Sequence, residues 1–427
     1  MACGLPDFPR EIFDLAESLE ILDLSGNALT SLPDDLPRLR KLRVIFCSDN
    51  QFTELPAILG RCEQLVMVGF KANQIRTVPG AALPKALRWL ILTDNQIEQI
   101  PPEIGRCTQL QKLMLAGNRL QSLPPELASC TALELLRLSA NRVNVFPDFL
   151  LTMPRLSWLA YAGNPFCGHQ EEQAFTQSPI FPISWDALTL QHTLGEGASG
   201  VIHEAEHRSG ETVQKVAVKL FKGSVTSDGL PRCEMTACIS AGAHENLIPV
   251  MGQVMDHPAD VQGLVMALIN PEFKNLAGPP SLDSCTRDIY ADGTCFDLLR
   301  VIRMARGIAS AVLHLHSQGL MHGDLYAHNI LHAGQGRVLL GDFGAASFFT
   351  PDDGMYALAL QRLEVRAFGC LLEELLVRCH TVNDVQAVLP TLNDLKTACL
   401  NEVTSARPLF HEIEQVLASL KNQVRSI

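Results

Sequence analysis

The chain has 427 residues, of which 47% are hydrophobic, and it carries a formal net charge of −12. This length allows two or three domains with cores of their own, so a disordered chain is excluded. The negative charge excludes a broad electrostatic contact with nucleic acid or anionic lipid, because like charges repel.

Neither a leader segment nor a membrane span is predicted. Residues 1–13 lack a basic stretch followed by an apolar one. No stretch reaches the roughly 18 uncharged apolar residues that a membrane helix needs. The thirteen cysteines are scattered without Cys-x-x-Cys pairs, which is typical of reduced thiols rather than of a disulfide framework or a zinc site. We therefore expect a cytoplasmic protein without membrane insertion.

An asparagine recurs through the first 170 residues at intervals of 22 or 23 residues. It occupies seven positions: Asn27, Asn50, Asn73, Asn95, Asn118, Asn141 and Asn164. Apolar side chains stand eight, five and three residues before each asparagine, giving the frame L-x-x-L-x-L-x-x-N-x-L. This frame resembles the leucine-rich repeat in its short form. The resemblance implies an α/β solenoid of stacked units, in which each asparagine bonds backbone groups at the turn after a short strand.

The repeat frame also divides the first part of the chain. It covers residues 19–166, whereas residues 1–18 lack it and are expected to cap the open end of the solenoid. Residues 167–184 contain a Gln/Glu run and two prolines and are interpreted as a linker. Three cysteines lie twelve residues after a repeat asparagine: Cys62, Cys107 and Cys130. A thiol that recurs in register is expected to be a small buried hydrophobic group rather than a ligand or a nucleophile.

Side chains alternate along a strand, so two positions of each repeat point away from the shared core. These positions, six and four residues before each asparagine, hold large apolar groups in most repeats. We expect them to be solvated and to form a concave surface that binds a protein substrate or regulator, or the second half of the chain. The residues expected at this surface are Val44, Phe46, Trp89, Ile91, Met114 and Trp158.

The second half carries motifs whose order is more informative than any single motif. Residues 194–200 read L-G-E-G-A-S-G, residues 216–219 read V-A-V-K, residues 322–329 read H-G-D-L-Y-A-H-N, and residues 342–344 read D-F-G. A glycine-rich loop alone is a weak signal, but a lysine strand after it argues against a dinucleotide-binding loop, where a helix begins within the glycines. In this order the motifs resemble the protein kinase signature, over residues 185–421.

The resemblance implies an α+β two-lobed domain that uses ATP and Mg²⁺ to phosphorylate a protein hydroxyl, of serine or threonine rather than tyrosine. Backbone groups of Gly195, Gly197 and Gly200 would cover the phosphates, since only glycine lets the backbone approach so closely. Beside a gatekeeper Met266, the adenine would contact four residues: Ile202, Ala217, Ala267 and Ile269.

Phosphoryl transfer requires positioning and charge neutralisation, and the resemblance implies which side chains supply them. Lys219 would hold the α- and β-phosphates and would be oriented by Glu234. Asn329 and Asp342 would be the Mg²⁺ ligands, because a hard cation prefers oxygen donors. Asp324 would accept or orient the proton of the substrate hydroxyl.

Several residues depart from the kinase pattern. Gly323 replaces the arginine before the catalytic aspartate, so no cation is expected to bind a phosphorylated activation segment. Tyr326 stands where serine/threonine kinases usually carry a lysine, and His328 stands where some tyrosine kinases carry an arginine. These two departures leave the choice between serine/threonine and tyrosine as the acceptor open. Glu364 takes the place of an aspartate at the start of a later helix. No A-P-E precedes it, so the substrate platform is expected to be short and Arg407 to lack its usual glutamate partner.

Two alternatives have to be weighed. Residues 203–207 match H-E-x-x-H, the zinc-protease motif, but that chemistry needs a helix. The kinase resemblance predicts a strand there, in which residues four apart are roughly 13 Å from each other. The other alternative is a pseudokinase scaffold, whose second domain binds nucleotide or nothing while the repeats hold protein partners.

Overall fold

The structure is a computed structural model that describes residues 3–177, 181–197, 199–222, 225–226, 228–380 and 388–425. The chain divides into two compact units, residues 1–166 and residues 167–427. Ala198 of the glycine loop and residues 178–180 of the expected linker lie outside the described residues. In the described part of the chain, no helix is both long and apolar enough to cross a membrane. The cytoplasmic location stays a prediction.

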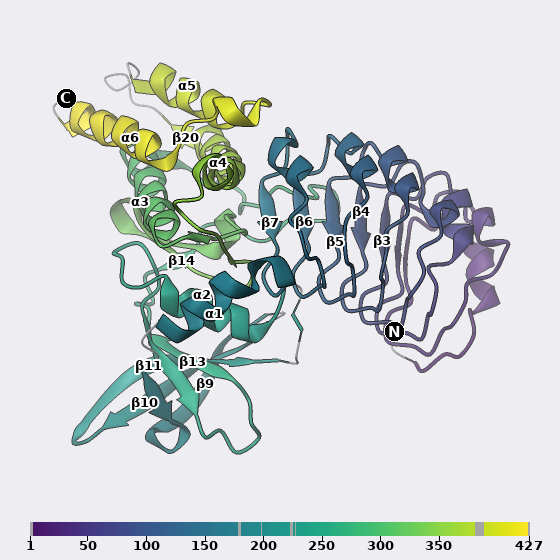
Figure 1. The fold of residues 1–427 in the computed structure, drawn as a ribbon, viewed down its shortest axis with the longest axis horizontal. Coiled ribbons are helices and arrows are strands. Elements are labelled where there is room, and N and C mark those ends of the chain that lie inside the picture. Colours follow the sequence, from purple (N-terminus) through teal and green to yellow (C-terminus); the bar gives the residue numbers. More distant parts are fainter. Residues whose placement is uncertain are drawn as a thin grey trace. The chain divides into compact units, whose positions relative to one another are not determined.

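The first unit is a solenoid whose strands form one parallel sheet in chain order (Figure 1). The strands are β1 (Ile21–Asp23), β2 (Val44–Phe46), β3 (Met67–Gly69), β4 (Trp89–Ile91), β5 (Lys112–Met114), β6 (Leu135–Arg137) and β7 (Trp158–Ala160). Short 3-10 helices lie between them, several starting directly after a proline, whose fixed φ favours a first helical turn. They are η1 (Arg10–Leu15), η2 (Leu36–Arg38), η3 (Ala57–Arg61), η4 (Gly80–Ala82), η5 (Pro102–Arg106), η6 (Pro125–Ser129), η7 (Asp148–Thr152) and η8 (Pro165–Cys167).

The repeat asparagines bond backbone groups of two successive repeats, as predicted. In the middle of the solenoid, Asn118 Oδ1 accepts from the N–H of Ile97 at 3.0 Å. Its Nδ2 donates to the carbonyl of Leu92 in the preceding repeat at 2.9 Å and to that of Leu115 in its own repeat at 3.0 Å. Five other asparagines make the same set of bonds: Asn50, Asn73, Asn95, Asn141 and Asn164. This series of hydrogen bonds, which we call the asparagine ladder, satisfies buried polar groups that the turns would otherwise leave unpaired.

The recurring thiols are packing groups, as predicted. Cys62, Cys107 and Cys130 are all buried. Burial raises the pKa of Cys62 and of Cys107 to about 11 and that of Cys130 to about 12. These thiols therefore stay protonated and behave as small hydrophobic side chains.

The prediction that the concave positions are all solvated is wrong. Val44 is 4% exposed and Trp158 is 1% exposed. Like positions lie side by side in a parallel sheet, so Val44 is flanked by Met67 and Trp158 by Leu135. The remaining expected residues, which we call the concave patch, are half-exposed: Phe46, Trp89, Ile91 and Met114.

The second unit has a lobe built on a six-stranded sheet and a lobe of helices. The sheet order is β8-β12-β13-β11-β10-β9, and all its pairings are antiparallel except that of β8 with β12. Its strands are β8 (Pro182–Ser184), β9 (Leu188–Glu196), β10 (Gly200–Ser209), β11 (Thr212–Phe221), β12 (Val250–Met255) and β13 (Gly263–Ala267). The expected linker thus contributes the edge strand β8. It also forms helix α1 (Gly168–Gln177), which packs against α2 (Pro231–Ser240).

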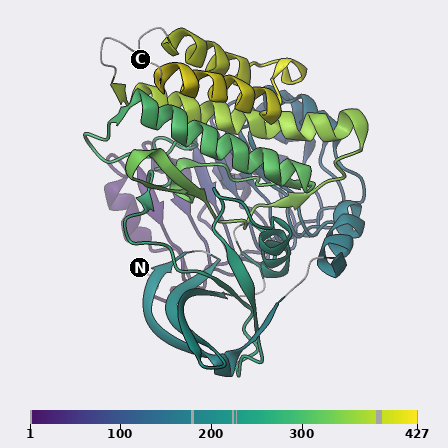
Figure 2. The same ribbon diagram turned by 90° about the vertical axis from the view of Figure 1, so that its left-hand side faces the viewer.

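Helices α3, α4 and α6 lie side by side in the other lobe, while the sheet forms a curved layer (Figure 2). The helices are α3 (Leu298–Ser317), α4 (Gly354–Val377), α5 (Leu389–Cys399) and α6 (Phe410–Arg425). Short strands form small sheets in this unit: β14 (Lys274–Asn275) with β17 (Ile330–Ala333) and β18 (Arg337–Leu340), β15 (Phe296–Asp297) with β20 (Cys379–His380), and β16 (Leu320–Met321) with β19 (Ser347–Phe348). The short helices among the described residues of this unit are η9 (Trp185–Ala187), η10 (Ala327–Asn329), η11 (Gly334–Gly336) and η13 (Thr404–Ala406). This is the predicted architecture, an α/β solenoid followed by an α+β two-lobed domain.

Candidate active site

A buried ion pair joins the sheet of the second unit to helix α2. Lys219 on β11 donates from Nζ to Oε1 of Glu234 on α2, and the two residues are 8% and 3% exposed. Burial opposes the positive charge of Lys219, but the carboxylates of Glu234 and Asp342 raise its pKa above the ordinary value. Lys219 is therefore held as a cation at the interface of strand, helix and D-F-G segment.

The glycines of the loop between β9 and β10 differ in how much space surrounds them. A Cβ added at Gly195 or Gly197 would meet no atom within 4 Å, so these positions are open to a ligand rather than closed by packing. A Cβ at Gly200 would lie 2.4 Å from the carbonyl oxygen of Leu220, so Gly200 is needed for the pairing of β10 with β11. The N–H of Gly197 donates to the carbonyl of Gly200 at 2.9 Å, which closes the turn.

Of the positions expected around the adenine, Ile202 and Ala217 share one face of the sheet, whereas Ala267 pairs with Val216 on the other face. Ala217 lies opposite Met266 on β13, while Ile202 on β10 lies opposite Lys219. At the end of β13, the N–H of Ala267 donates to the carbonyl of Pro249 at 2.9 Å. Ala267 could therefore contribute its carbonyl but not its N–H to a ligand, which leaves the N–H of Ile269 as the expected hinge donor.

The catalytic loop is bonded internally around Asp324. Both hydrogen bonds of Asn329 Nδ2 go to Asp324, to its Oδ2 at 2.7 Å and to its carbonyl at 3.0 Å. The ring of His322 donates from Nε2 to the carbonyl of Gly341 at 2.9 Å and accepts from the N–H of Asp324 at 3.3 Å. It also lies 5.2 Å from the ring of Phe343. Two segments far apart in the sequence are thus held together beside the Asp324 carboxylate.

Asp342 lies two residues after the end of β18 and has a φ of 57°, in the left-handed region that aspartate adopts only at some cost. Its Oδ1 accepts from the N–H of Gly344 at 3.2 Å. Because the amide nitrogen of Asn329 is directed to Asp324, the amide oxygen is left as its acceptor atom. A carboxylate and an amide oxygen are donors that suit Mg²⁺, so Asn329 and Asp342 fit the expected metal-binding role.

Comparison with known proteins agrees with this arrangement. Residues 188–369 match the family described as protein tyrosine and serine/threonine kinase, and residues 18–39 and 85–143 match leucine-rich repeat families. The chain joins leucine-rich repeats to a protein kinase domain. Similar curated proteins include fibroblast growth factor receptor 1 of Pleurodeles waltl, 30% identical over 203 residues, and that of Xenopus laevis, 27% identical over 199 residues. These matches cover 45% and 44% of this chain but only 25% and 24% of the receptors.

The buried carboxylate of Glu364 bonds the backbone of the loop that carries Asp324. Glu364 on α4 accepts from the N–H of Gly323 at 2.7 Å and from His316 Nε2 at 2.7 Å. Burial by itself raises the pKa of Glu364, but the hydrogen bond and charge of His316 hold it below the ordinary value. Gly323 has a φ of 73°, a conformation that favours glycine. The glutamate at this position thus serves the backbone of the loop directly.

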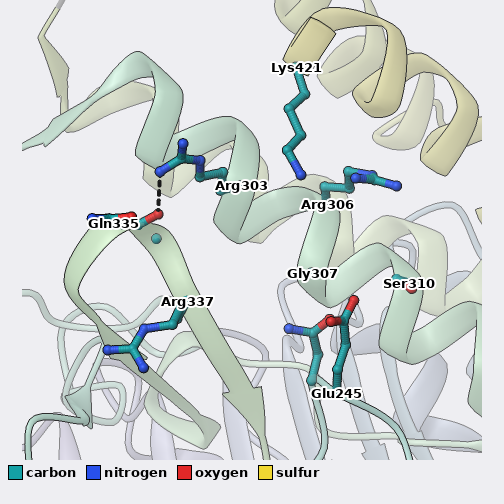
Figure 3. Close-up of a pocket in the computed structure, with 10 residues that line it drawn as sticks. Glu245, Arg303, Arg306, Gly307, Ser310, Gln335, Arg337 and Lys421 are labelled. Carbon is teal, nitrogen blue, oxygen red and sulfur yellow. Dashed lines mark hydrogen bonds between the residues drawn. The ribbon is translucent and has the colours of Figure 1, made fainter. Parts of the chain in front are cut away.

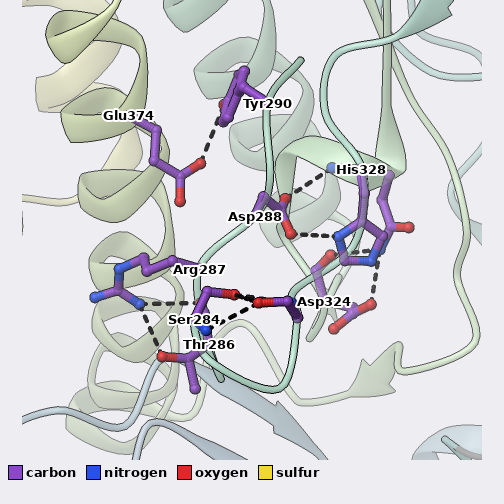
Figure 4. A network of polar contacts seen from close by, with 10 residues as sticks. Ser284, Thr286, Arg287, Asp288, Tyr290, Asp324, His328 and Glu374 are labelled. Carbon is purple, nitrogen blue, oxygen red and sulfur yellow. Dashed lines mark hydrogen bonds and ion pairs between the residues drawn. The ribbon is translucent and has the colours of Figure 1, made fainter. Parts of the chain in front are cut away.

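Asp288 is a residue of the site that the sequence motifs did not indicate. It is 5% exposed, and its carboxylate accepts from the backbone N–H of His328 at 2.9 Å and from His328 Nδ1 at 2.7 Å (Figure 4). Burial alone would lower the pKa of His328, but Asp288, with Asp324 and Asp342 nearby, raises it above the ordinary value. Asp288 lies 40 residues before His328 and carries no motif, so only the fold reveals it.

The activation segment of the kinase domain is short, as predicted. It runs from Asp342 through β19 and ends where α4 begins at Gly354. Arg407, expected to lack its usual partner, is buried and donates to the backbone carbonyls of Asn401 at 2.8 Å and Arg362 at 3.1 Å. Burial lowers the pKa of Arg407 to about 10. Backbone carbonyls thus bond the guanidinium in this domain.

The H-E-x-x-H motif lies on a strand. Residues 203–207 are part of β10 and pair with β11 throughout. Glu204, which a protease would use beside zinc, forms an ion pair with Lys215 at 2.7 Å. A strand separates the two histidines by too much for a shared zinc ion, so the protease alternative is rejected.

Proposed function

We propose that this chain is an active protein kinase that transfers the γ-phosphate of ATP to a protein hydroxyl in the presence of Mg²⁺. The observation that carries the proposal is the buried ion pair of Lys219 with Glu234, within electrostatic reach of Asp342. A buried, paired lysine beside an open glycine loop is a suitable partner for polyphosphate, because its charge is already desolvated and oriented.

The nucleotide-binding roles follow from the positions of the residues. Lys219 binds the α- and β-phosphates, and the open backbone at Gly195 and Gly197 covers them. The adenine packs against Ile202 and Ala217 and receives its hydrogen bonds from the hinge, through the carbonyl of Ala267 and the N–H of Ile269. Gly200 covers the phosphates from the start of β10, where its close approach to Leu220 leaves no room for a Cβ.

The catalytic roles concern the other lobe. Asn329 and Asp342 hold Mg²⁺, which neutralises phosphate charge when it is bound. Asp324 accepts the proton of the acceptor hydroxyl. One hydrogen bond from Asn329 orients its carboxylate, and a second holds its backbone carbonyl. Glu364 keeps the loop backbone in place, and Asp288 does the same for His328.

The acceptor in this proposal is a serine or threonine hydroxyl. The rings of Tyr326 and His328 lie 5.0 Å apart on the catalytic loop, two and four residues after Asp324. The leucine-rich repeats bind a protein substrate or regulator, and the concave patch is the surface that we assign to this contact.

Radiolabelled ATP and Mg²⁺ with the purified full chain, alone and with a generic protein substrate, test the proposal. Asp324→Asn should lower transfer by about 10² to 10⁴-fold, the usual effect of losing a general base, while ATP binding persists. Phosphoamino acid analysis of the product identifies the acceptor. A wild-type chain that binds ATP without transferring phosphate is instead a pseudokinase scaffold. Transfer at the wild-type rate by Asp324→Asn would show that the catalytic assignment is wrong.

A further inference from the structure

A polar cavity lies in the kinase domain away from the candidate active site, where helix α3, helix α6, the turn between β17 and β18 and the loop after α2 converge (Figure 3). Its volume is about 290 Å³. The residues that line it are polar or glycine, so the cavity suits a small hydrophilic ligand rather than an apolar one.

Four cationic side chains converge on this cavity although the chain as a whole is acidic. Arg303 and Arg306 lie on α3, Arg337 begins β18, and Lys421 extends from α6 towards Arg306 (Figure 3). The cavity lining includes one carboxylate, that of Glu245. Positive charge therefore exceeds negative charge on its walls, which favours an anionic ligand.

The arginines are partly engaged but keep donors for a ligand. Arg306 pairs with Glu414 at 2.8 Å and Arg337 with Glu272 at 2.6 Å, in contacts whose side chains are between 23% and 54% exposed. Arg303 donates from Nη1 to the carbonyl of Gln335 at 3.0 Å. A guanidinium has five N–H donors, and exposed ion pairs contribute little, so the remaining donors can bind an anion without large cost.

The backbone walls of the cavity are held close to α3. A Cβ at Gly307 would lie 2.6 Å from Val338 Cγ2 and 2.9 Å from Asn246 Nδ2. A Cβ at Gly336, whose φ is 78°, would lie 2.9 Å from the carbonyl oxygen of Arg300. Asn246 in turn donates to the carbonyl of Val338 at 3.0 Å. The cationic side chains are thus carried on firmly packed elements.

We propose that this cavity binds a small phosphate-bearing anion, such as a pyrophosphate or phosphorylated headgroup of comparable size. Arginine forks match the oxygen geometry of phosphate, and Lys421 adds a further positive charge. The shared chemistry is a phosphate ester or anhydride, free in solution or on a lipid headgroup. This site is separate from the nucleotide site and does not depend on the proposed phosphoryl transfer.

Isothermal titration of the full chain with sodium pyrophosphate, without nucleotide or Mg²⁺, tests the proposal. The Arg303→Gln/Arg337→Gln double variant should weaken binding at least tenfold, whereas Glu245→Gln should strengthen it severalfold because a repulsive carboxylate is removed. Arg300→Gln is the matched control, since Arg300 also lies on α3 but outside this cavity, and it should bind like the wild type. Lys219→Met should bind pyrophosphate as tightly as the wild type does, because it alters only the nucleotide site.

Vesicles with and without a phosphorylated inositol lipid form a second arm, which separates lipid headgroups from free anions as the source. Binding in either arm that is lost in the double variant supports the proposal. Should the double variant fail to fold, as judged by circular dichroism, Lys421→Gln replaces it. The proposal is overturned if neither arm binds the wild-type chain, or if the folded cavity variant binds as tightly as Arg300→Gln.

Discussion

Several side chains in this protein make hydrogen bonds to more than one partner, and different atoms of the side chain bond different partners. The amide nitrogen of Asn329 serves Asp324, which leaves its oxygen for a metal. The carboxylate of Glu364 serves the backbone of Gly323 and the ring of His316 at the same time. In the solenoid, Asn118 uses both its oxygen and its nitrogen to connect two repeats. Substitutions at such residues therefore remove more than one contact.

Lys219→Met and Asp342→Ala should each lower phosphoryl transfer at least about a hundredfold, because each removes a charge that is aimed at the reacting phosphates or their metal. The matched control is Lys215→Met, which removes a lysine of the same strand whose partner is Glu204. Initial rates with labelled ATP are the measurement. Equal losses in Lys219→Met and Lys215→Met would argue against a specific role of Lys219.

Asn118→Ala should destabilise the solenoid by about 1–3 kcal/mol, because the buried N–H of Ile97 and two carbonyls lose their partner. Asn27→Ala should cost less, since Asn27 is half-exposed at the first repeat and water can replace it. Urea unfolding followed by circular dichroism measures both. The ladder contributes little if the two variants unfold at the same urea concentration as the wild type.

At the scale of secondary structure, helix α1 is part of the kinase unit rather than a free connector. Its Glu172 forms an ion pair with Arg232 of α2 at 3.4 Å, and the Arg232 guanidinium lies 4.3 Å from the centre of the Phe175 ring. Arg232 is two residues before Glu234 on α2. The segment that follows the repeats therefore contacts the helix whose glutamate orients Lys219.

Activity should not depend on phosphorylation of the activation segment, because Gly323 provides no arginine to bind an added phosphate. Ser347 is buried in β19, whereas Thr350 is exposed and Tyr356 is half-exposed. A triple variant with Ser347→Ala, Thr350→Ala and Tyr356→Phe should keep transfer within about threefold of the wild type. Rates after phosphatase treatment provide the control. Loss of activity in a folded triple variant would contradict this expectation.

At the scale of the whole molecule, the chain combines a repeat unit suited to holding a protein with a kinase domain whose substrate platform is short. A protein contact through the concave patch would compensate for that short platform by raising the local concentration of a substrate. The half-exposed ring of Trp89, with Lys112 Nζ 4.5 Å from its centre, lies in the middle of this patch.

Trp89→Ala with Met114→Ala should weaken capture of the protein substrate, or change basal autophosphorylation, by about tenfold, because large side chains at an interface centre dominate binding. The melting temperature should change little, since both side chains are half-exposed. Val145→Ala is the control, because Val145 is 77% exposed outside the concave positions. Unchanged capture and unchanged autophosphorylation in a folded double variant would contradict the assignment of this surface.

Much of the fold follows from local patterns in the chain. The spacing of leucines and asparagines predicts strands, turns and ladder, because each repeat makes the same bonds with its neighbours. The ordered motifs predict where Lys219, Asp324 and Asp342 lie, since each motif carries its own turn or strand. These features depend on residues close in sequence or on a repeated frame.

Other features depend on contacts between distant segments, which no local pattern encodes. Asp288 reaches His328 from a loop without a motif, and Val44 and Trp158 are buried although alternation along a single strand predicts exposure. The cavity between α3, α6, the β17–β18 turn and the loop after α2 is likewise formed by four segments that only folding brings together. Burial and charge at such places are properties of the packed chain, because each depends on side chains contributed by separate elements.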